Sequence, residues 1–230
     1  MTRDDIAARI RFNLNDAGVT FYSASDVNNS IQDGYDEVVA LSQTIEKVTT
    51  LSWVSQLVYY NFRNLVTDFI RPIAIFDNNN NRWLEHKSLP FLQAQRQDFE
   101  TIAGAPFWYC VMDFTYTAIS PRLETATGTF DFLYKANAAT LAASDVPVLP
   151  DSLTSVLELY GTADLLEQAE EYEKAGRYWY GNVKLNQLGY FDILDKIKKE
   201  VRNRESPDRY HTLREQYLQA NLRDATLVVR

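Results

Sequence analysis

The chain has 230 residues but only one cysteine, Cys110, and two histidines, His86 and His211. A lone cysteine excludes a disulfide within the chain and indicates folding in a reducing compartment. Zinc sites need several Cys or His ligands at close spacing, and a Ser or Cys nucleophile needs a nearby base. We therefore expect no metal, no cofactor and no catalytic residues of these kinds. Cys110 stands in an apolar stretch, so we interpret it as a core residue.

Long apolar runs and an excess of positive charge are also missing. No stretch approaches the ~20 apolar residues of a membrane-spanning helix, and the charged start has no apolar core of a secretory signal. The net charge of −8 argues against non-specific binding to DNA or RNA, which requires a cationic face. No glycine-rich phosphate-binding loop is present. We expect a protein without membrane or nucleic-acid-reading elements.

The charge is distributed unevenly along the chain. From Lys184 onward ten Lys or Arg stand against seven Asp or Glu, which gives +3, and the remainder carries −11. This pattern favours two ends that contact different surfaces. An uneven sampling of solvent-exposed residues explains it equally well.

Helical patterns occupy the beginning of the chain. Thr2 followed by Asp5 is a capping signal, and an apolar face over residues 6–14 predicts a short helix. Residues 25–45 predict a long helix, capped by Ser23 or Ser25, with apolar residues recurring at alternating steps of four and three. Its seam comprises Val27, Ile31, Gly34, Val38, Leu41 and Ile45. Gly34 would allow another backbone to approach closely.

The middle of the chain has the composition of strands. Beta-branched and aromatic residues dominate residues 48–135, with strand segments at 57–62, 70–76, 108–114 and 129–134. Residues 77–81 are rich in Asn, which tolerates left-handed backbone angles, so they predict a hairpin turn. A helix is expected over residues 90–102, ended by Gly104.

The chain then returns to helical patterns. Residues 145–152 contain two prolines and predict an extended lead-in, with Asp151 or Ser152 as the cap of the next helix. One apolar face is expected to run through Leu153, Val156, Leu157, Tyr160, Leu165, Leu166, Ala169 and Tyr172. A last long helix is predicted near residues 179–204, with a seam of Tyr190, Leu194, Ile197 and Val201.

Two groups of residues suggest chemistry, and each has a simpler explanation. Asp77, Asp113 and Asp131 lie at or near predicted strands, where two close carboxylates can act as acid and base. Nothing in the sequence fixes their separation, and surface-facing strand positions explain them more simply. The aromatic residues 178–180 beside Arg177 could stack on bases, but an acidic chain favours packing or a subunit contact.

The order of these elements resembles that of the head-to-tail adaptor (connector or neck) proteins of tailed bacteriophages. Those proteins begin with a capped helix pair, pass through a strand-rich insertion and return through a proline-containing segment into antiparallel helices. The residues that carry the likeness are 25–45, the strand entry 104–109, Ser120-Pro121 and, above all, 145–150 leading into residues 153–172. Residues 57–62 lack the Tyr-x-Leu-Pro ending often found at that point in such adaptors.

The resemblance implies an α+β fold. We expect a helical bundle from residues 1–46 and 150–205, a β-rich antiparallel insertion with a short helix from 47–149, and an extended C-terminal docking arm from 206–230. It further implies a structural virion protein that forms a ring, usually of twelve copies, between the portal protein and the tail or nozzle proteins. Double-stranded DNA would pass through this ring without sequence-specific binding, and assembly would take place in the host cytoplasm.

Two sets of contact residues follow as hypotheses. The arm would bind the portal through Leu213, Tyr217, Leu222, Leu227 and Val229. The insertion tip, which consists of Asn78, Asn79, Asn80 and Asn81, would face the tail or a neighbouring subunit. The arm could equally be a terminal helix that packs on its own bundle. Two other functions stay open: a hydrolytic enzyme that uses strand carboxylates, and a generic scaffolding or binding protein.

Overall fold

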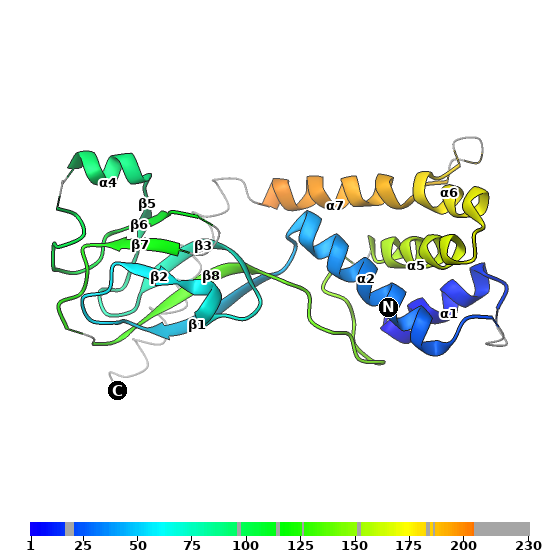
Figure 1. Cartoon of the computed structure of the whole chain (residues 1–230), viewed down its shortest axis with the longest axis horizontal. Helices are drawn as coiled ribbons and strands as arrows, with labels where there is room; N and C mark the ends of the chain where they lie inside the picture. Colours follow the sequence, from blue (N-terminus) through cyan, green and yellow to red (C-terminus); the bar gives the residue numbers. More distant parts are fainter. Residues whose placement is uncertain are drawn as a thin grey trace, which may run out of the picture. The chain divides into compact units, whose positions relative to one another are not determined.

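A computed structural model of the chain describes residues 1–16, 21–95, 98–113, 116–125, 127–150, 153–182, 185 and 187–204. It contains helices and antiparallel sheets, which confirms the α+β class (Figure 1). The chain divides into two compact units. We call residues 1–42 with 140–230 the helical unit and residues 43–139 the insertion. The arm residues 206–230 lie outside the described part of the chain.

The described part of the helical unit contains five α-helices. They are α1 (Arg3–Asn13), α2 (Ala24–Ser42), α5 (Ser155–Gln168), α6 (Tyr172–Tyr180) and α7 (Tyr190–Arg204). The capping box predicted for α1 is present, because Asp5 N donates to Thr2 Oγ1 and Thr2 N donates to the Asp5 carboxylate. Ser23 and Asp26 form the same reciprocal pair at the start of α2. Local polar residues therefore set where both helices begin.

The seam of α2 is correct for its first four members and wrong at its end. Val27, Ile31, Gly34 and Val38 are buried, whereas Leu41 is 50% exposed. The helix ends at Ser42, where Gln43 adopts a positive φ of 52° and turns the chain away. Ile45, which is buried, therefore lies beyond the helix. The helical period therefore fails at Leu41, inside the helix, while Ile45 is buried from a position outside it.

Gly34 allows close packing, although against a side chain. A Cβ built on Gly34 would lie 2.6 Å from Tyr160 Cδ1 of α5. A second glycine, Gly161 on α5, meets α1 in the same way, because its Cβ would lie 2.5 Å from Ile10 Cδ1. The helices α1, α2 and α5 are thus held at a separation that only glycine permits at these two positions.

The predicted helix over residues 179–204 is two helices in the structure. The seam Tyr190, Leu194, Ile197 and Val201 is buried in α7 as predicted. Residue Trp179 instead belongs to α6, and the chain breaks at Gly181, which has a φ of 74°. A Cβ on Gly189 would lie 2.2 Å from Gly181 N, so the two glycines bring the backbone into contact with itself between the helices.

The apolar face predicted for residues 153–172 is also shorter than expected. Its residues through Leu166 are buried or half-buried, but Ala169 and Tyr172 are exposed. The helix α5 ends at Gln168, and Glu170 takes a positive φ of 61°, so the face is not continued into α6. The proposed caps Asp151 and Ser152 lie outside the described residues.

The segment before α5 was predicted to be extended, but its described part bends at Val148 and Leu149. It is tied to two helices. Arg3 N donates to Asp145 O at 2.9 Å and Asp4 N donates to Ala143 O at 3.2 Å, so two backbone amides in the first turn of α1 have partners there. Val148 N donates to the hydroxyl of Tyr35 on α2 at 3.0 Å. These bonds fix the segment on the helical unit.

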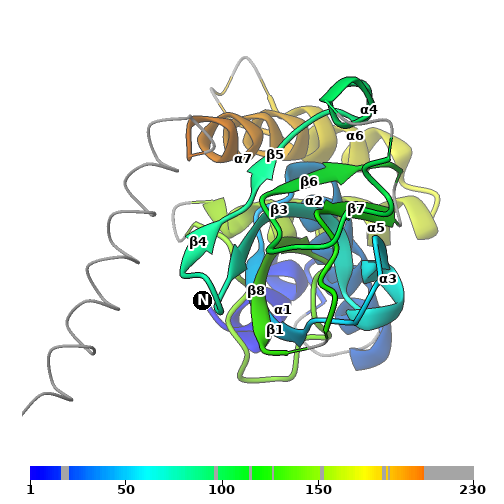
Figure 2. The ribbon, with the colours of Figure 1, turned by 90° about the vertical axis from the view of Figure 1, so that its left-hand side faces the viewer.

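The insertion contains two four-stranded sheets, seen in Figure 2. The first has the order β1 (Glu46–Ser52), β8 (Thr129–Ala136), β3 (Phe69–Asp77) and β4 (Arg82–Trp83). The second has the order β2 (Tyr59–Asn61), β7 (Tyr116–Ser120), β6 (Trp108–Val111) and β5 (Glu85–His86). Within these two sheets, the described strand pairings are antiparallel except that of β5 with β6.

Aromatic rings fill the core of the insertion. Phe62, in the one-turn helix α3 (Phe62–Leu65), stacks on Phe132 with ring centroids 3.8 Å apart. The ring centroid of Trp53 lies 4.3 Å from that of Phe130, which belongs to β8 as Phe132 does. These buried rings come from segments far apart in the sequence, and each removes a large apolar area from water.

Several sequence predictions in the insertion hold, and three need correction. The strand expected at 108–114 is limited to β6, which ends at Val111. The predicted segments at 70–76 and 129–134 are β3 and β8, and the turn at 77–81 joins the paired strands β3 and β4. The strand expected at 57–62 is limited to β2, because Phe62 begins α3. The helix expected at 90–102 is α4 (Leu89–Gln95), and residues 98–101 form a turn instead.

Candidate interaction surface

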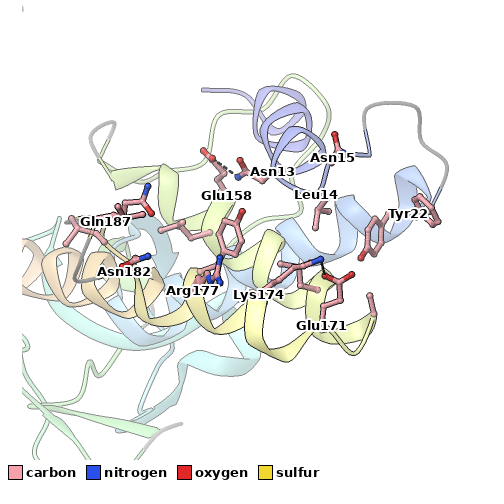
Figure 3. Close-up of a pocket in the computed structure, with 17 residues that line it drawn as sticks. Asn13, Leu14, Asn15, Tyr22, Glu158, Glu171, Lys174, Arg177, Asn182 and Gln187 are labelled. Atoms are coloured by element: carbon pink, nitrogen blue, oxygen red, sulfur yellow. Dashed lines mark hydrogen bonds and ion pairs between the residues drawn. The ribbon is translucent and has the colours of Figure 1, made fainter.

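The helical unit carries a groove of about 990 Å³. It is lined by residues from the C-terminal end of α1, from α5, from α6 and from the connection between α6 and α7 (Figure 3). The lining residues include Asn13, Phe21, Glu158, Arg177 and Leu188. The walls therefore come from segments that are distant in the sequence.

A buried carboxylate holds the corner after α1 at one end of the groove. The carboxylate of Asp16 accepts hydrogen bonds from Phe21 N at 3.2 Å and Tyr22 N at 3.1 Å, and pairs with Arg11 Nη1 at 3.2 Å. Tyr22 donates its hydroxyl to Leu165 O at 3.2 Å, and burial raises the pKa of this tyrosine. The side chain of Phe21 is left 83% exposed at the rim.

The acidic residues of the groove already have partners. Glu158 accepts hydrogen bonds from Asn13 Nδ2 at 3.0 Å and from Arg9 Nη1 at 3.5 Å. Glu171 is paired with Lys174 (Figure 3). Arg177 is exposed, and within the described part of the chain no carboxylate lies within ion-pair distance of it. The groove thus offers one cation to an incoming group.

The opposite wall is built by the connection from α6 to α7. Asn182 and Gln187 form a short backbone bridge, with Asn182 N donating to Gln187 O at 2.9 Å and Gln187 N donating to Asn182 O at 3.0 Å. This bridge displays Leu185 and Leu188 outward, with Leu185 66% exposed. Apolar side chains at both rims and a cation between them suit the binding of a protein segment.

The aromatic residues beside Arg177 divide into packed and exposed ones. Trp179 packs edge-on against Tyr160 and Tyr190, and its Nε1 donates to Glu167 Oε1 at 2.7 Å. Tyr180, in contrast, is 71% exposed and contacts Phe191, with ring centroids 5.3 Å apart. Trp179 is therefore a packing residue, as the acidic composition of the chain suggests.

The carboxylates that suggested hydrolysis have local structural partners. Asp77 is buried and accepts Asn79 N at 3.0 Å and Asn80 Nδ2 at 2.6 Å, and so holds the turn between β3 and β4. Asp131 accepts Thr50 Oγ1 at 2.7 Å. In the pairing of β3 with β8, Asp77 lies opposite Phe130, and the two side chains share one face of the sheet. Asp131 follows Phe130 in β8, so its carboxylate points to the other face.

The third of these carboxylates and Cys110 have equally local surroundings. The Asp113 carboxylate accepts Tyr116 N, three residues further along the chain, at 2.7 Å. Cys110 is buried, as predicted, and burial raises the pKa of its thiol, which disfavours the reactive thiolate. Among the described residues, no group of three or more His, Cys, Asp or Glu is placed to hold a metal ion.

The insertion tip is exposed, and the side-chain amides of Asn78, Asn79 and Asn80 donate hydrogen bonds within the subunit. Asn78 Nδ2 donates to Thr129 Oγ1 at 3.2 Å, and Asn79 Nδ2 donates to Thr127 O. Asn81 takes the left-handed backbone expected of an Asn-rich turn, with a φ of 49°. A Cβ on Gly128 would lie 1.7 Å from Asn79 Oδ1, so the tip and the loop before β8 fit closely only with glycine there.

The predicted arm residues cannot be placed in this way. Leu213, Tyr217, Leu222, Leu227 and Val229 all lie outside the described residues. The groove was not predicted from the sequence. Its one local signal was the pair Gly181 and Gly189, which ends α6 and shapes the wall that carries Leu188.

Comparison with known proteins supports the resemblance seen in the sequence. In the described part of the chain, no helix combines the length and apolar character that crossing a membrane requires. No curated protein matches the chain. The model of the family described as SU10 adaptor protein matches residues 1–214, which is most of the chain and includes both units. The chain therefore belongs to the SU10 adaptor protein family, a family of phage head-to-tail adaptors, and is a bacteriophage structural protein.

Proposed function

We propose that the protein forms a ring, usually of twelve copies, between the portal and the tail of the virion, and extends the channel for DNA ejection. One observation carries this proposal beyond the family assignment. The helical unit has a buried core, yet it keeps large apolar side chains exposed to water. Phe21, which lines the groove, is 83% exposed, and Phe12 of α1 is 82% exposed. Such side chains gain free energy when another protein surface covers them.

A ring requires two different, complementary surfaces on each subunit. The groove of the helical unit is suitable for one of them. The channel requires an inner surface that does not hold phosphates, and the net charge of −8 is compatible with that. Double-stranded DNA would then slide past the ring without sequence-specific contacts.

The docking arm, residues 206–230, is proposed to bind the portal. Its anchors would be Leu213, Tyr217, Leu222, Leu227 and Val229. The insertion tip would face the tail proteins or a neighbouring subunit, and its exposed position agrees with this. Because the side-chain amides of Asn78, Asn79 and Asn80 are engaged within the subunit, the tip would present a fixed shape.

The proposed role needs no catalysis. Asp77 and Asp131 lie on opposite faces of their sheet, and both hold local hydrogen bonds. No specific observation therefore favours a carboxylate-based hydrolase or a generic scaffolding protein.

The test is assembly on a portal ring. The full chain and a chain ending at Arg204 are each mixed with purified portal rings, and the mass of the products is measured. We expect the full chain to add as a ring and the shortened chain to stay folded but unbound. A full chain that remains monomeric beside the portal contradicts the adaptor ring. Binding by the shortened chain contradicts only the proposed role of the arm and not the adaptor ring.

A further inference from the structure

Two exposed valines lie on the segment that leads into α5. Val146 is 52% exposed and Val148 is 61% exposed, whereas Pro147 and Leu149 between and beside them are buried. Leu149 N donates to Pro147 O at 2.8 Å, which makes a three-residue turn with Val148 at its apex. We call Val146 and Val148 the valine ridge. Nothing in the core of the subunit requires these two side chains to be apolar.

The valine ridge is fixed in position. The backbone carbonyl of Asp145 accepts Arg3 N, the Asp145 carboxylate accepts Ala142 N at 2.7 Å, and Val148 N is bound to the Tyr35 hydroxyl. A fixed apolar turn loses little conformational entropy when it binds, which favours a specific contact.

The ridge and the groove lie at opposite ends of α1. The ridge segment is bonded to Arg3 and Asp4 in the first turn, whereas the groove includes Asn13 at the last residue of the helix. Eleven helical residues span about 16 Å. One copy therefore cannot place its own ridge in its own groove, but it can offer the ridge to a neighbour.

The charges around the two surfaces are complementary. Near the ridge segment stand the exposed carboxylates of Asp4 and Asp145, with Arg3 partly offsetting Asp4 at 3.3 Å. In the groove Glu158 pairs with Arg9 at 3.5 Å and Glu171 pairs with Lys174, while Arg177 has no carboxylate at ion-pair distance among the described residues. An acidic apolar ridge therefore matches an apolar groove with an available cation.

We propose that the groove of one subunit receives the valine ridge of the next copy, which gives the head-to-tail contact of the ring. Leu185, Leu188 and Phe21 would cover the valines, and Arg177 would face the acidic residues beside them. The contact joins two different surfaces of the same unit, as a closed ring requires. This inference rests on the proposed adaptor ring and names the surfaces that build it.

The first experiment replaces the exposed valine at the apex. In the full chain, Val148→Lys should weaken ring assembly on the portal about tenfold or more, because each contact would bury an added cation near Arg177 in an apolar groove. The thermal unfolding midpoint should stay unchanged, since the side chain is exposed in the subunit. The matched control is Val54→Lys, which alters an exposed valine of the insertion and should leave assembly intact. Normal assembly of the Val148→Lys chain would overturn the proposal.

The second experiment identifies the occupant of the groove. Val148→Cys and Leu188→Cys are combined in one chain and treated with a short thiol cross-linker after assembly on the portal. We expect a ladder of covalent multimers, whereas either single variant should give dimers at most. The wild-type chain is the blank, because its only thiol, Cys110, is buried.

The outcomes separate this inference from the proposed function. A ring that forms without the ladder overturns the groove assignment and leaves the adaptor ring standing. Attachment of the Leu188→Cys chain to a cysteine of the portal would show a different occupant and also overturn it. A chain that stays monomeric on the portal contradicts both the ring and this contact.

Discussion

The insertion and the helical unit bury their apolar residues by different means. The insertion stacks large aromatic rings, such as Phe62 on Phe132, which come from distant strands and turns. The helical unit instead removes side chains at Gly34 and Gly161 so that its helices approach closely. The insertion depends on the large side chains in its core, whereas the helical unit depends on the absence of a side chain at its glycines. Substitutions should therefore damage the two regions in opposite ways.

The largest effect is expected from removing a ring of the insertion. Phe132 is fully buried and contacts the rings of Phe62, Phe69 and Tyr134. Phe132→Ala should lower the free energy of unfolding by about 3–5 kcal/mol, because it removes apolar contacts and leaves a cavity. Denaturant unfolding measures this loss. Val48→Ala, at an exposed position of the neighbouring strand β1, is the control and should change stability by less than about 0.5 kcal/mol. Equal effects of both substitutions would contradict the aromatic core.

The next effect is expected from adding one methyl group to the helical unit. Gly34→Ala places a Cβ 2.6 Å from the Tyr160 ring and 3.2 Å from Tyr160 Cβ, so the ring cannot simply turn away. Overpacking of this kind costs about 1–3 kcal/mol, which exceeds the gain of about 1 kcal/mol that alanine brings within a helix.

Gly176→Ala is the matched control for that substitution. It lies in α6, and no heavy atom stands within 4 Å of the Cβ that it would add. Only the helix propensity changes there, so this variant should be more stable than wild type by up to about 1 kcal/mol. Thermal unfolding of both variants gives the comparison. A stabilised Gly34→Ala chain would show that α2 and α5 are not held by the close approach.

These glycines also show how much the sequence could predict. The burial of Val27, Ile31 and Val38 followed from the helical period, because periodicity is a local property of the chain. The length of the helix was misjudged because it ends at Ser42, where the backbone of Gln43 turns the chain, and the period does not contain that end. The break at Gly181 was missed because its cause is a contact with Gly189, eight positions away and visible only in three dimensions.

The groove could not be predicted for the same kind of reason. Asn13, Glu158 and Arg177 are spread over most of the chain and meet only after α1, α5 and α6 have packed. The family resemblance rests on the order of elements, and it gave the class of protein without these contacts. The exposed Val146 and Val148 look like part of an ordinary apolar segment in the sequence, since their neighbours Pro147 and Leu149 are buried.

A smaller effect should distinguish the polar contacts of the insertion. Tyr134 donates its hydroxyl to Asp68 at 2.9 Å, and burial together with this carboxylate raises the pKa of Tyr134 to about 12. The neutral phenol is favoured in the folded state. Its contribution to stability is therefore complete below pH 10, the ordinary pKa of tyrosine, and is lost as the pH rises from 10 to 12.

Tyr134→Phe should reduce the fall in stability over that pH range. The measurement is the free energy of unfolding of wild type and variant at pH 9 and at pH 12, and their difference should shrink at the higher pH. Tyr180→Phe, which alters an exposed phenol of the helical unit, is the control and should follow the wild-type profile. If the free energy of unfolding changed with pH in parallel for all three chains, the bond between Tyr134 and Asp68 would not favour the neutral phenol in the folded state.

The smallest effect tests whether the helical unit also depends on a local polar contact. Thr2→Ala removes the oxygen that accepts Asp5 N at 3.2 Å and should cost about 1 kcal/mol, while Thr2→Ser should retain most of the stability. Since Arg3 N and Asp4 N bind the segment that carries the valine ridge, fraying of α1 should also loosen that segment. Hydrogen exchange at Arg3, Asp4 and Val148 should therefore become faster in Thr2→Ala and stay slow in Thr2→Ser. Unchanged exchange at Val148 would show that the bond from Val148 N to Tyr35 holds the ridge independently of the helix start.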